Sequence, residues 1–349
     1  MAKGSSSPIS MAVVGLGRAG WDIHIRAIRR RKDFVLTEVM DIDEGRLKEA
    51  KDEFGCRTFR NWKRFLRESE AELVVVASQS MDHARMSWEA LEAGHNVLCE
   101  KPMATRFADI DRMIAAEKKS GKTLAIHQNA RIAGDLLHIK EQIRRGVLGR
   151  IFAVKRASSA FSRRNDWQTL HKYGGGQLNN NGVHQIDQVL QILDSPAVAV
   201  FGDLQQILNP GDVEDHVKVV FRTESGATGD VELAVSALPL TTWVVMGDRG
   251  TLTSDGETTR LRYLEGKRKL PTIKPVDASQ APGRRYGTTP PERLSFVEET
   301  IPSKPSKTLN FYDLLYDSLR KGKPLLATVQ SARRTMEVLR MARKGTKFG

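Results

Sequence analysis

Short apolar runs alternate with amphipathic stretches through the first 130 residues. The apolar runs lie at 9–14, 34–43, 71–78, 95–100 and 122–129. The stretches between them repeat apolar side chains at helical spacing, and two of these stretches end in Gly94 and Gly121. Glycine commonly follows the last turn of a helix because it adopts a positive φ without a steric penalty. The alternation predicts a doubly wound parallel sheet, the Rossmann architecture.

The pattern changes after about residue 150. Strand-like runs separated by turn sequences such as TESG and GDRG lie at 151–158, 199–208, 216–222, 227–235 and 242–247. Such runs are typical of an antiparallel sheet with one apolar and one polar face. We therefore predict an α/β plus α+β fold class. A Rossmann domain spans residues 9–130, and a domain with an open-faced, mostly antiparallel β-sheet spans residues 131–349.

Three further segments complete this division. Residues 1–8 are predicted to form a disordered leader rather than an export signal, because they lack the apolar run of such a signal. Residues 265–308 hold seven prolines and little periodicity, so they form either an arm on a partner subunit or a flexible insertion. A helical segment with the turn RKGKP follows over residues 309–343.

The first apolar run ends in the glycine-rich sequence GLGRAG. Gly15 permits a tight turn, Gly17 lets the backbone approach a pyrophosphate, and Gly20 allows close packing of helix on strand. The turn opens a helix, whose positive N-terminus attracts phosphate. We predict that the turn binds a dinucleotide through Gly15, Gly17, Arg18, Ala19 and Gly20.

The second apolar run ends in Asp41. A carboxylate at this point accepts hydrogen bonds from the adenosine ribose and repels a 2′-phosphate, which favours NAD over NADP. Arg46 lies nearby in the sequence and keeps NADP open as the less favoured cofactor. Ser78 and His83, after the next strand, are predicted to add further cofactor contacts.

The sequence CEKPMA follows the strand at 95–100. Glu100, Lys101 and Pro102 should therefore lie at the carboxyl edge of the sheet, where the nicotinamide end of the cofactor sits. We predict that Glu100 and Lys101 contact the cofactor, that Lys101 directs its charge into the cleft, and that Pro102 holds a fixed turn, cis or trans.

Three glycines and three asparagines precede a single histidine in YGGGQLNNNGVHQIDQVLQIL, residues 173–193. The stretch from Asn180 predicts an amphipathic helix. Its apolar side carries Val183, Ile186, Leu190 and Leu193, and its polar side carries Asn180, His184 and Asp187. The glycines let the backbone pass close beneath a ligand, so we expect His184 and Asn180 to reach the cleft. A locally bonded core histidine is the alternative.

Composition narrows the possible partners. The 349 residues carry a net charge of +13, but the basic residues are scattered without interleaved aromatic side chains, so we predict no nucleic-acid partner. No apolar run approaches the roughly 20 residues that cross a bilayer, so we predict no membrane association. Two cysteines are too few for a disulfide framework, which favours a cytoplasmic location. No metal site is predicted.

Together, the glycine turn, the EKP sequence and the GGGxLxNxGxHxxD pattern resemble the glucose-fructose oxidoreductase, inositol dehydrogenase and MocA family, over nearly the whole chain. The resemblance implies NAD(P)-dependent oxidation or reduction of a sugar, polyol or related carbohydrate, and a homodimer or homotetramer formed through the second sheet. The family's catalytic lysine, aspartate and histidine match Lys101, Asn180 and His184. An asparagine cannot take a proton, so proton transfer rests on His184, Lys101 or water.

We predict hydride transfer from a carbinol carbon to nicotinamide, with His184 as general base and Lys101 stabilising the alkoxide, or with these roles exchanged. Asn180 completes the predicted catalytic set. Segments expected around the same cleft supply further substrate contacts, namely Gln128, Asn129, Arg131, Arg163, Arg164 and Trp167, in addition to Asn180 and His184.

Three functions stay open at this point. The first is an NAD-dependent carbohydrate dehydrogenase. The second is a glycoside-cleaving enzyme that oxidises and re-reduces the sugar with no net redox change. The third is a non-catalytic NAD-binding regulator, which the substitution at Asn180 favours and which Lys101 and His184 oppose.

Overall fold

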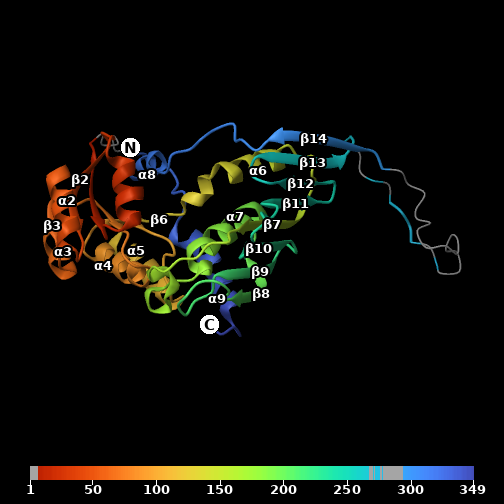
Figure 1. Ribbon diagram of the computed structural model, residues 1–349. Coiled ribbons are helices and arrows are strands. Elements are labelled where there is room, and N and C mark those ends of the chain that lie inside the picture. The colour runs from red at the N-terminus through yellow and green to blue at the C-terminus, as the bar shows by residue number, and fades with distance from the viewer. Residues whose placement is uncertain (1–6, 267–269, 271, 276, 278–293) are drawn as a thin grey trace.

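A computed structural model describes residues 7–266, 270, 272–275, 277 and 294–349 (Figure 1). Two sheets lie side by side along the molecule, and helices cover both. Most of the predicted leader, residues 1–6, lies outside the described residues. Within the described part of the chain, no helix combines the length and hydropathy needed to span a membrane.

The first sheet is parallel throughout, with strand order β3-β2-β1-β4-β5-β6. Its strands are β1 (Ile9–Val14), β2 (Phe34–Met40), β3 (Arg57–Phe59), β4 (Leu73–Val76), β5 (Asn96–Cys99) and β6 (Leu124–Ile126). The chain reverses direction across the sheet between β1 and β4, which is where ligands bind in doubly wound sheets. The predicted Rossmann sheet is confirmed.

Side chains of β1 alternate between two hydrophobic cores. Met11 and Val13 belong to the core on one face, and Ala12 and Val14 to the core on the other. A strand buried on both faces reads as a continuous apolar run, as β1 does. The helices of this region are η1 (Ala19–Ile25), α1 (Arg26–Ile28), α2 (Glu44–Phe54), α3 (Trp62–Glu68), η2 (Ser80–Asp82), α4 (His83–Glu92) and α5 (Ala108–Ser120).

The second sheet has eight strands in the order β14-β13-β12-β11-β7-β10-β9-β8, and every neighbouring pair is antiparallel except β7 with β10. The strands are β7 (Ile151–Ser159), β8 (Ala197–Gln205), β9 (His216–Thr223), β10 (Thr228–Ala234), β11 (Trp243–Gly247), β12 (Gly250–Ser254), β13 (Thr258–Leu264) and β14 (Phe296–Pro302). Helix α6 (Gly134–Arg144) follows the first sheet, and α7 (Val183–Leu193) packs on β7 and β10. The predicted mostly antiparallel sheet is confirmed.

Strand β14 corrects one expectation. Residues 265–308 are predicted to form an arm on a partner subunit or a flexible insertion, yet Phe296–Pro302 pairs with β13 along its whole length within the second sheet. The remainder of that segment lies largely outside the described residues.

The chain end returns to the first sheet. The predicted helical segment consists of α8 (Phe311–Lys321) and α9 (Val329–Arg343), and α8 ends at Gly322 with φ +65°, inside the predicted turn. Tyr312 and Leu315 of α8 share a hydrophobic core with β1 and β2. Figure 1 shows α8 beside the first sheet and α9 beside β8. The predicted domain boundary at residue 130 therefore assigns α8 to the second domain, although α8 packs in a core of the first.

Candidate active site

The glycine turn after β1 is shaped by close packing. Gly15 has φ +92°, and a Cβ there would lie 2.6 Å from the Ala77 carbonyl oxygen at the end of β4. A Cβ on Gly20 would fall on the carbonyl oxygen of Gly15, whereas a Cβ on Gly17 would meet nothing within 4 Å. The space above Gly17 therefore fits a ligand that approaches the backbone closely, such as a pyrophosphate.

Two other predicted residues of the turn lie at the start of η1. Ala19 is its first residue, and no side chain caps that helix start. Arg18 is exposed and forms an ion pair with Asp166, which lies beyond β7. The helix start can therefore donate backbone N–H groups to an anion, and Arg18 spans the space between the two sheets.

Asp41 follows β2 and is only 5% exposed. Its carboxylate accepts hydrogen bonds from the backbone N–H groups of Leu16, at 2.6 Å, and Asp43, at 2.9 Å. Each carboxylate oxygen can accept more than one bond, so both retain capacity for a ribose hydroxyl. Arg46 lies 3.6 Å from the same carboxylate and is half exposed.

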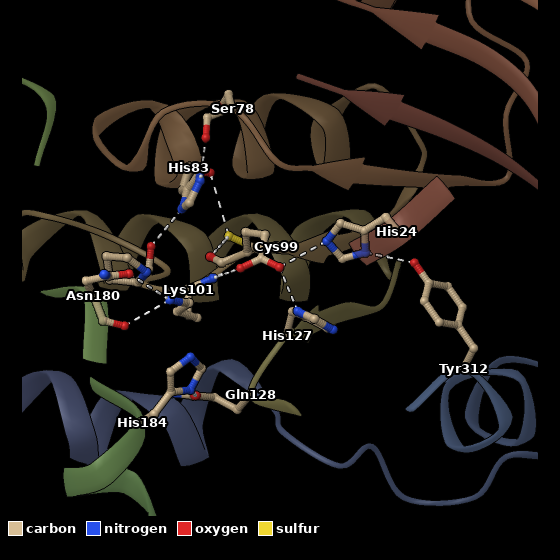
Figure 2. A network of polar contacts seen from close by, with 12 residues as sticks. His24, Ser78, His83, Cys99, Lys101, His127, Gln128, Asn180, His184 and Tyr312 are labelled. Atoms are coloured by element: carbon tan, nitrogen blue, oxygen red, sulfur yellow. Dashed lines mark hydrogen bonds and ion pairs between the residues drawn. The ribbon is translucent and has the colours of Figure 1, made fainter. Parts of the chain in front are cut away.

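His83 is turned away from the position predicted for it. Its Nδ1 lies 2.8 Å from the carbonyl oxygen of Pro102 and its Nε2 lies 3.1 Å from that of Ser78, and the ring is buried (Figure 2). The ring therefore braces the ends of β4 and β5 and does not face a cofactor. Ser78 is half-buried and its Cα lies against Gly15, so its predicted cofactor contact stays a prediction.

Glu100 also departs from its predicted role. Its carboxylate is buried and lies 3.0 Å from His24 Nε2 and 2.6 Å from His127 Nδ1, and it accepts a third hydrogen bond from the backbone N–H of Lys101 (Figure 2). Burial alone would raise the pKa of Glu100, but the two imidazoles hold that pKa well below its usual range. The charge of Glu100 is satisfied inside the protein and is not available to a cofactor.

His24, Glu100 and His127 are the one group among the described residues whose ligand atoms lie close enough to hold a metal ion, within 4.8 Å of one another. Their facing atoms are already joined by hydrogen bonds, so we treat them as a hydrogen-bonded cluster. The predicted absence of a metal stays a prediction.

Lys101 points from the first sheet toward the second. The peptide bond between Lys101 and Pro102 is cis, one of the two forms predicted. Lys101 Nζ donates to the Asn180 backbone oxygen at 2.9 Å and to Asn180 Oδ1 at 3.3 Å (Figure 2). Burial lowers the pKa of Lys101, while Glu100 raises it and Arg164 lowers it further. The ammonium group of Lys101 therefore loses its proton at a lower pH than the side chain of a lysine in water does.

The three glycines form a tightly packed turn before α7. Gly174 and Gly176 have φ of +73° and +101°, and Cβ atoms at Gly175 and Gly176 would collide with the Gln168 backbone and the Glu214 carboxylate. Asn179 donates to the carbonyl oxygens of Gly174 and Gly175 at 3.0 and 3.1 Å. The segment Leu178–Gly182 then forms a π-turn, η6, which presents Asn180 to Lys101.

His184 is placed by the first turn of α7 and by Gln128, which follows β6. Its Nδ1 lies 3.1 Å from Gln128 Oε1 (Figure 2). An amide oxygen only accepts, so Nδ1 carries the proton and Nε2 is left with a lone pair. Burial, reinforced by the charge of Lys101, lowers the pKa of His184 to about 3. The ring is therefore neutral at physiological pH, and its Nε2 can accept a hydrogen bond from a hydroxyl.

Asp187 and Arg131 form a buried ion pair on the polar face of α7. Asp187 is buried, and Arg131 donates to both of its carboxylate oxygens at 2.7 and 2.8 Å. Arg131 also donates to the Leu326 carbonyl and the Ser331 hydroxyl. We therefore assign Arg131 to holding α7 in place, not to contacting substrate. Gln128 is buried and acts through His184, whereas Asn129 is exposed.

Arg164 of the segment 163–167 lines the same hollow as Asn180. Arg164 donates to both carboxylate oxygens of Asp166, while Arg163 is exposed and Trp167 is half-buried. A small, open hollow at Asn180 is lined by Arg164, Gln168, Thr169, Gly176, Gln177, Asn209, Val213 and Glu214. Arg164 thus lies beside Asn180, and the substrate contacts of Arg163, Arg164 and Trp167 stay predictions.

Several residues of the site had no signal in the sequence. His24, His127 and Tyr312 surround Glu100, and Glu214 accepts a hydrogen bond from the Leu178 backbone at 2.9 Å. His24 lies in η1 and Tyr312 in α8, His127 follows β6, and Glu214 precedes β9, and none belongs to a motif. A search for buried polar residues next to the EKP sequence finds them only once the fold is known.

Comparison with known proteins places this geometry in context. Residues 9–128 match the model described as an oxidoreductase family with an NAD-binding Rossmann fold, and residues 136–253 match the GFO/IDH/MocA C-terminal domain. The chain belongs to the GFO/IDH/MocA oxidoreductase family. It is an oxidoreductase with a nicotinamide cofactor, and the resemblance noted in the sequence is confirmed.

Relatives within the family differ in substrate. The chain is 29% identical to myo-inositol 2-dehydrogenase of Thermotoga maritima over 64% of this chain and 67% of that enzyme. It is 29% identical to D-glucoside 3-dehydrogenase of Escherichia coli over 56% of each chain. These names imply a small-molecule substrate for the family members they describe.

Solved structures share the fold over nearly the whole chain. An NAD-binding protein from Listeria innocua has a TM-score of 0.80 at 23% identity, with 96% of both chains covered. The WlbA dehydrogenase of Bordetella pertussis, solved with NADH and UDP-GlcNAcA, has a TM-score of 0.73 at 23% identity, covering 97% of this chain and 98% of that one. At this level of identity the likeness establishes the fold alone.

Proposed function

We propose that the protein is an NAD-dependent oxidoreductase that oxidises or reduces a CH–OH group of a sugar, polyol or related carbohydrate. The observation that carries the proposal is the convergence of Lys101, Asn180 and His184 from the two sheets. Lys101 Nζ contacts Asn180, and its charge depresses the pKa of His184. A cation, an amide and a neutral imidazole around one point fit a hydroxyl that loses its proton.

The pKa directions favour the exchanged assignment of roles. A general base works best when its pKa lies near the working pH. His184, with a pKa of about 3, is a weak proton acceptor, whereas burial brings the pKa of Lys101 down from its ordinary value of 10.5. We therefore assign proton transfer to Lys101, whose neutral amine takes the hydroxyl proton during oxidation and whose ammonium returns it during reduction, and we assign orientation of the substrate hydroxyl to His184 Nε2. When bound, the nicotinamide supplies the hydride acceptor or donor.

Asn180 orients the substrate in this proposal. Its Oδ1 accepts from Lys101 Nζ and from Gln168 Nε2, at 3.3 and 3.4 Å. The amide nitrogen therefore remains to donate to a substrate oxygen. The hollow beyond Asn180 is lined by amides, a carboxylate and an arginine, groups that hydrogen-bond hydroxyls. The inositol and glucoside dehydrogenases among the relatives support a carbohydrate of this kind.

NAD is the proposed form of the cofactor. The Asp41 carboxylate lies at the glycine turn, where it would repel a 2′-phosphate, and Gly17 leaves the approach to the turn open. Arg46 beside Asp41 is the feature that would favour NADP.

Exposed apolar side chains on the second sheet, among them Phe201 and Phe152, support the predicted homo-oligomer.

Two measurements test the proposal. Nucleotide released from freshly purified, denatured protein is identified first, and sugars, polyols and aryl glycosides are then screened for absorbance of reduced nicotinamide. Substrate-dependent NADH is the expected result. Release of aglycone without net NADH would instead assign the glycoside-cleaving reaction, and nucleotide binding without turnover of any substrate would assign a regulator.

A further inference from the structure

Four buried polar side chains join the cofactor turn, the EKP turn and the end of the chain. His24 belongs to η1, Glu100 follows β5, His127 follows β6, and Tyr312 belongs to α8 (Figure 2). Glu100 Oε1 lies 3.0 Å from His24 Nε2 and 2.6 Å from His127 Nδ1, and His24 Nδ1 lies 2.8 Å from the Tyr312 hydroxyl. All four side chains are less than one-tenth exposed.

One arrangement of protons satisfies His24, Glu100 and Tyr312. Burial lowers the pKa of His24, so that ring is neutral and carries a single proton. The anionic Glu100 requires that proton on Nε2, because a lone pair there would face a carboxylate. Nδ1 must then accept, and the Tyr312 hydroxyl donates to it. The phenol of α8 thus selects the tautomer that holds the carboxylate.

The carboxylate in turn holds Lys101. Glu100 Oε2 accepts the Lys101 backbone N–H at 3.0 Å, and His83 fixes the next residue through the Pro102 carbonyl. Among the charged and titratable groups that face Lys101, Glu100 raises its pKa and Arg164 of the 163–167 segment lowers it. His184 of α7 and His83 of α4 each have their own pKa lowered by Lys101 and by burial, so both are neutral.

We infer that Tyr312, His24 and Glu100 are positioning residues for Lys101. The phenol fixes the imidazole, the imidazole fixes the carboxylate, and the carboxylate fixes both the backbone and the charge of the lysine. Because His24 lies in the helix that begins at the glycine turn, the same chain of contacts ties the cofactor-binding turn to the catalytic lysine. The inference rests on the proposed function for its effect on turnover.

The direct test measures the titration of Lys101 in the protein without substrate. Competitive acylation with acetic anhydride across a pH series, read by peptide mass spectrometry, gives the midpoint for Lys101. Glu100→Gln should lower that midpoint by about one pH unit or more, because a negative charge next to the ammonium is removed. An unchanged midpoint in folded Glu100→Gln protein, checked by near-ultraviolet circular dichroism, would overturn the inference.

Tyr312→Phe removes only the hydroxyl and has a matched control in Tyr316→Phe. Both rings pack edge-on against Phe34 from α8, but Tyr316 lies outside the cluster. Tyr312→Phe should lower kcat about tenfold, the size expected when a donor that fixes a tautomer is lost, and Tyr316→Phe should not. Equal rates in the two variants would remove Tyr312 from the inference.

A double-variant cycle separates positioning from a general structural effect. If Tyr312 acts through Lys101, Tyr312→Phe should lower kcat in wild type and have no further effect in Lys101→Met. If the kcat losses of Tyr312→Phe and Lys101→Met multiply in the double variant, the two residues act independently and the inference is contradicted. Should Lys101→Met itself leave kcat unchanged, the proposed function fails, and the acylation midpoint of Glu100→Gln still decides whether Glu100 controls Lys101.

Discussion

The two sides of the cleft are built differently. On the first sheet, Lys101 is held by a buried cluster whose charges and protons are satisfied within the protein. On the second sheet, Asn180 is held by a glycine turn whose packing leaves a hollow beside it. The charges on the first side are therefore satisfied before any ligand binds, whereas the second side borders a small hollow lined by polar groups.

The largest expected effect concerns the support of α7. Asp187→Asn removes the negative charge that pairs with the buried Arg131, and breaking such a pair costs about 3–5 kcal/mol. Denaturant unfolding should show this loss. Asp194→Asn at the end of α7 is the control, because Asp194 is exposed and pairs only loosely with Arg334. Similar losses in both variants would mean that the buried pair does not anchor the second side.

His184→Ala tests the catalytic contribution of the second side. Loss of the ring should lower kcat about 100-fold, since the hydroxyl is no longer oriented against Lys101. The affinity for NAD, measured by fluorescence titration, should stay close to wild type, because His184 contacts Gln128 and not the glycine turn. A loss of NAD affinity with an unchanged kcat would place His184 in the cofactor site instead.

Gly176→Ala tests whether the glycine turn needs its packing as well as its φ. A Cβ at Gly176 would collide with Glu214, and the backbone has φ +101°. Gly256 has the same φ but a Cβ there would meet only Thr242 Oγ1, at 4.0 Å. Gly176→Ala should cost about 1–3 kcal/mol of unfolding free energy and should exceed Gly256→Ala. Equal costs would show that conformational strain alone explains the glycine.

Asp41→Ser tests cofactor choice on the first side. Removing the carboxylate should narrow the preference for NAD over NADP by about tenfold, as expected when one hydrogen-bonded charge is lost. Asp43→Ser is the control, because serine still caps α2 and Asp41 is retained. Titration of both nucleotides decides the matter, and a wild-type protein that already prefers NADP would contradict the assignment of Asp41.

Local sequence patterns predicted the strands and turns whose conformation depends mainly on residues close by in the chain. Strands β1, β4, β5 and β6 are almost wholly buried, so they read as apolar runs, and the glycine turn lies between β1 and its helix. Strand β14 was missed because it alternates between exposed and half-buried side chains near a proline-rich stretch. The polar face of α7 was read correctly as polar, but the sequence could not show that Asp187 faces a buried arginine.

The site was predictable only where a motif carries it. Lys101, Asn180 and His184 follow from two motifs, whereas the cluster behind Lys101 joins positions 24, 100, 127 and 312. Contacts across such separations arise from strand order and from the return of α8. Glu100 and His83 were predicted to face the cofactor for the same reason, because sequence places a residue at a sheet edge but not the direction of its side chain.

The pH dependence of kcat for wild type and Lys101→Met tests the central claim most directly. If Lys101 takes the hydroxyl proton, wild-type kcat for oxidation should rise with pH and level off below the ordinary lysine pKa of 10.5, because burial lowers the pKa of Lys101. Lys101→Met should lack that rise and be about 100- to 1000-fold slower. A Lys101→Met variant that keeps the wild-type rate and profile would contradict the account.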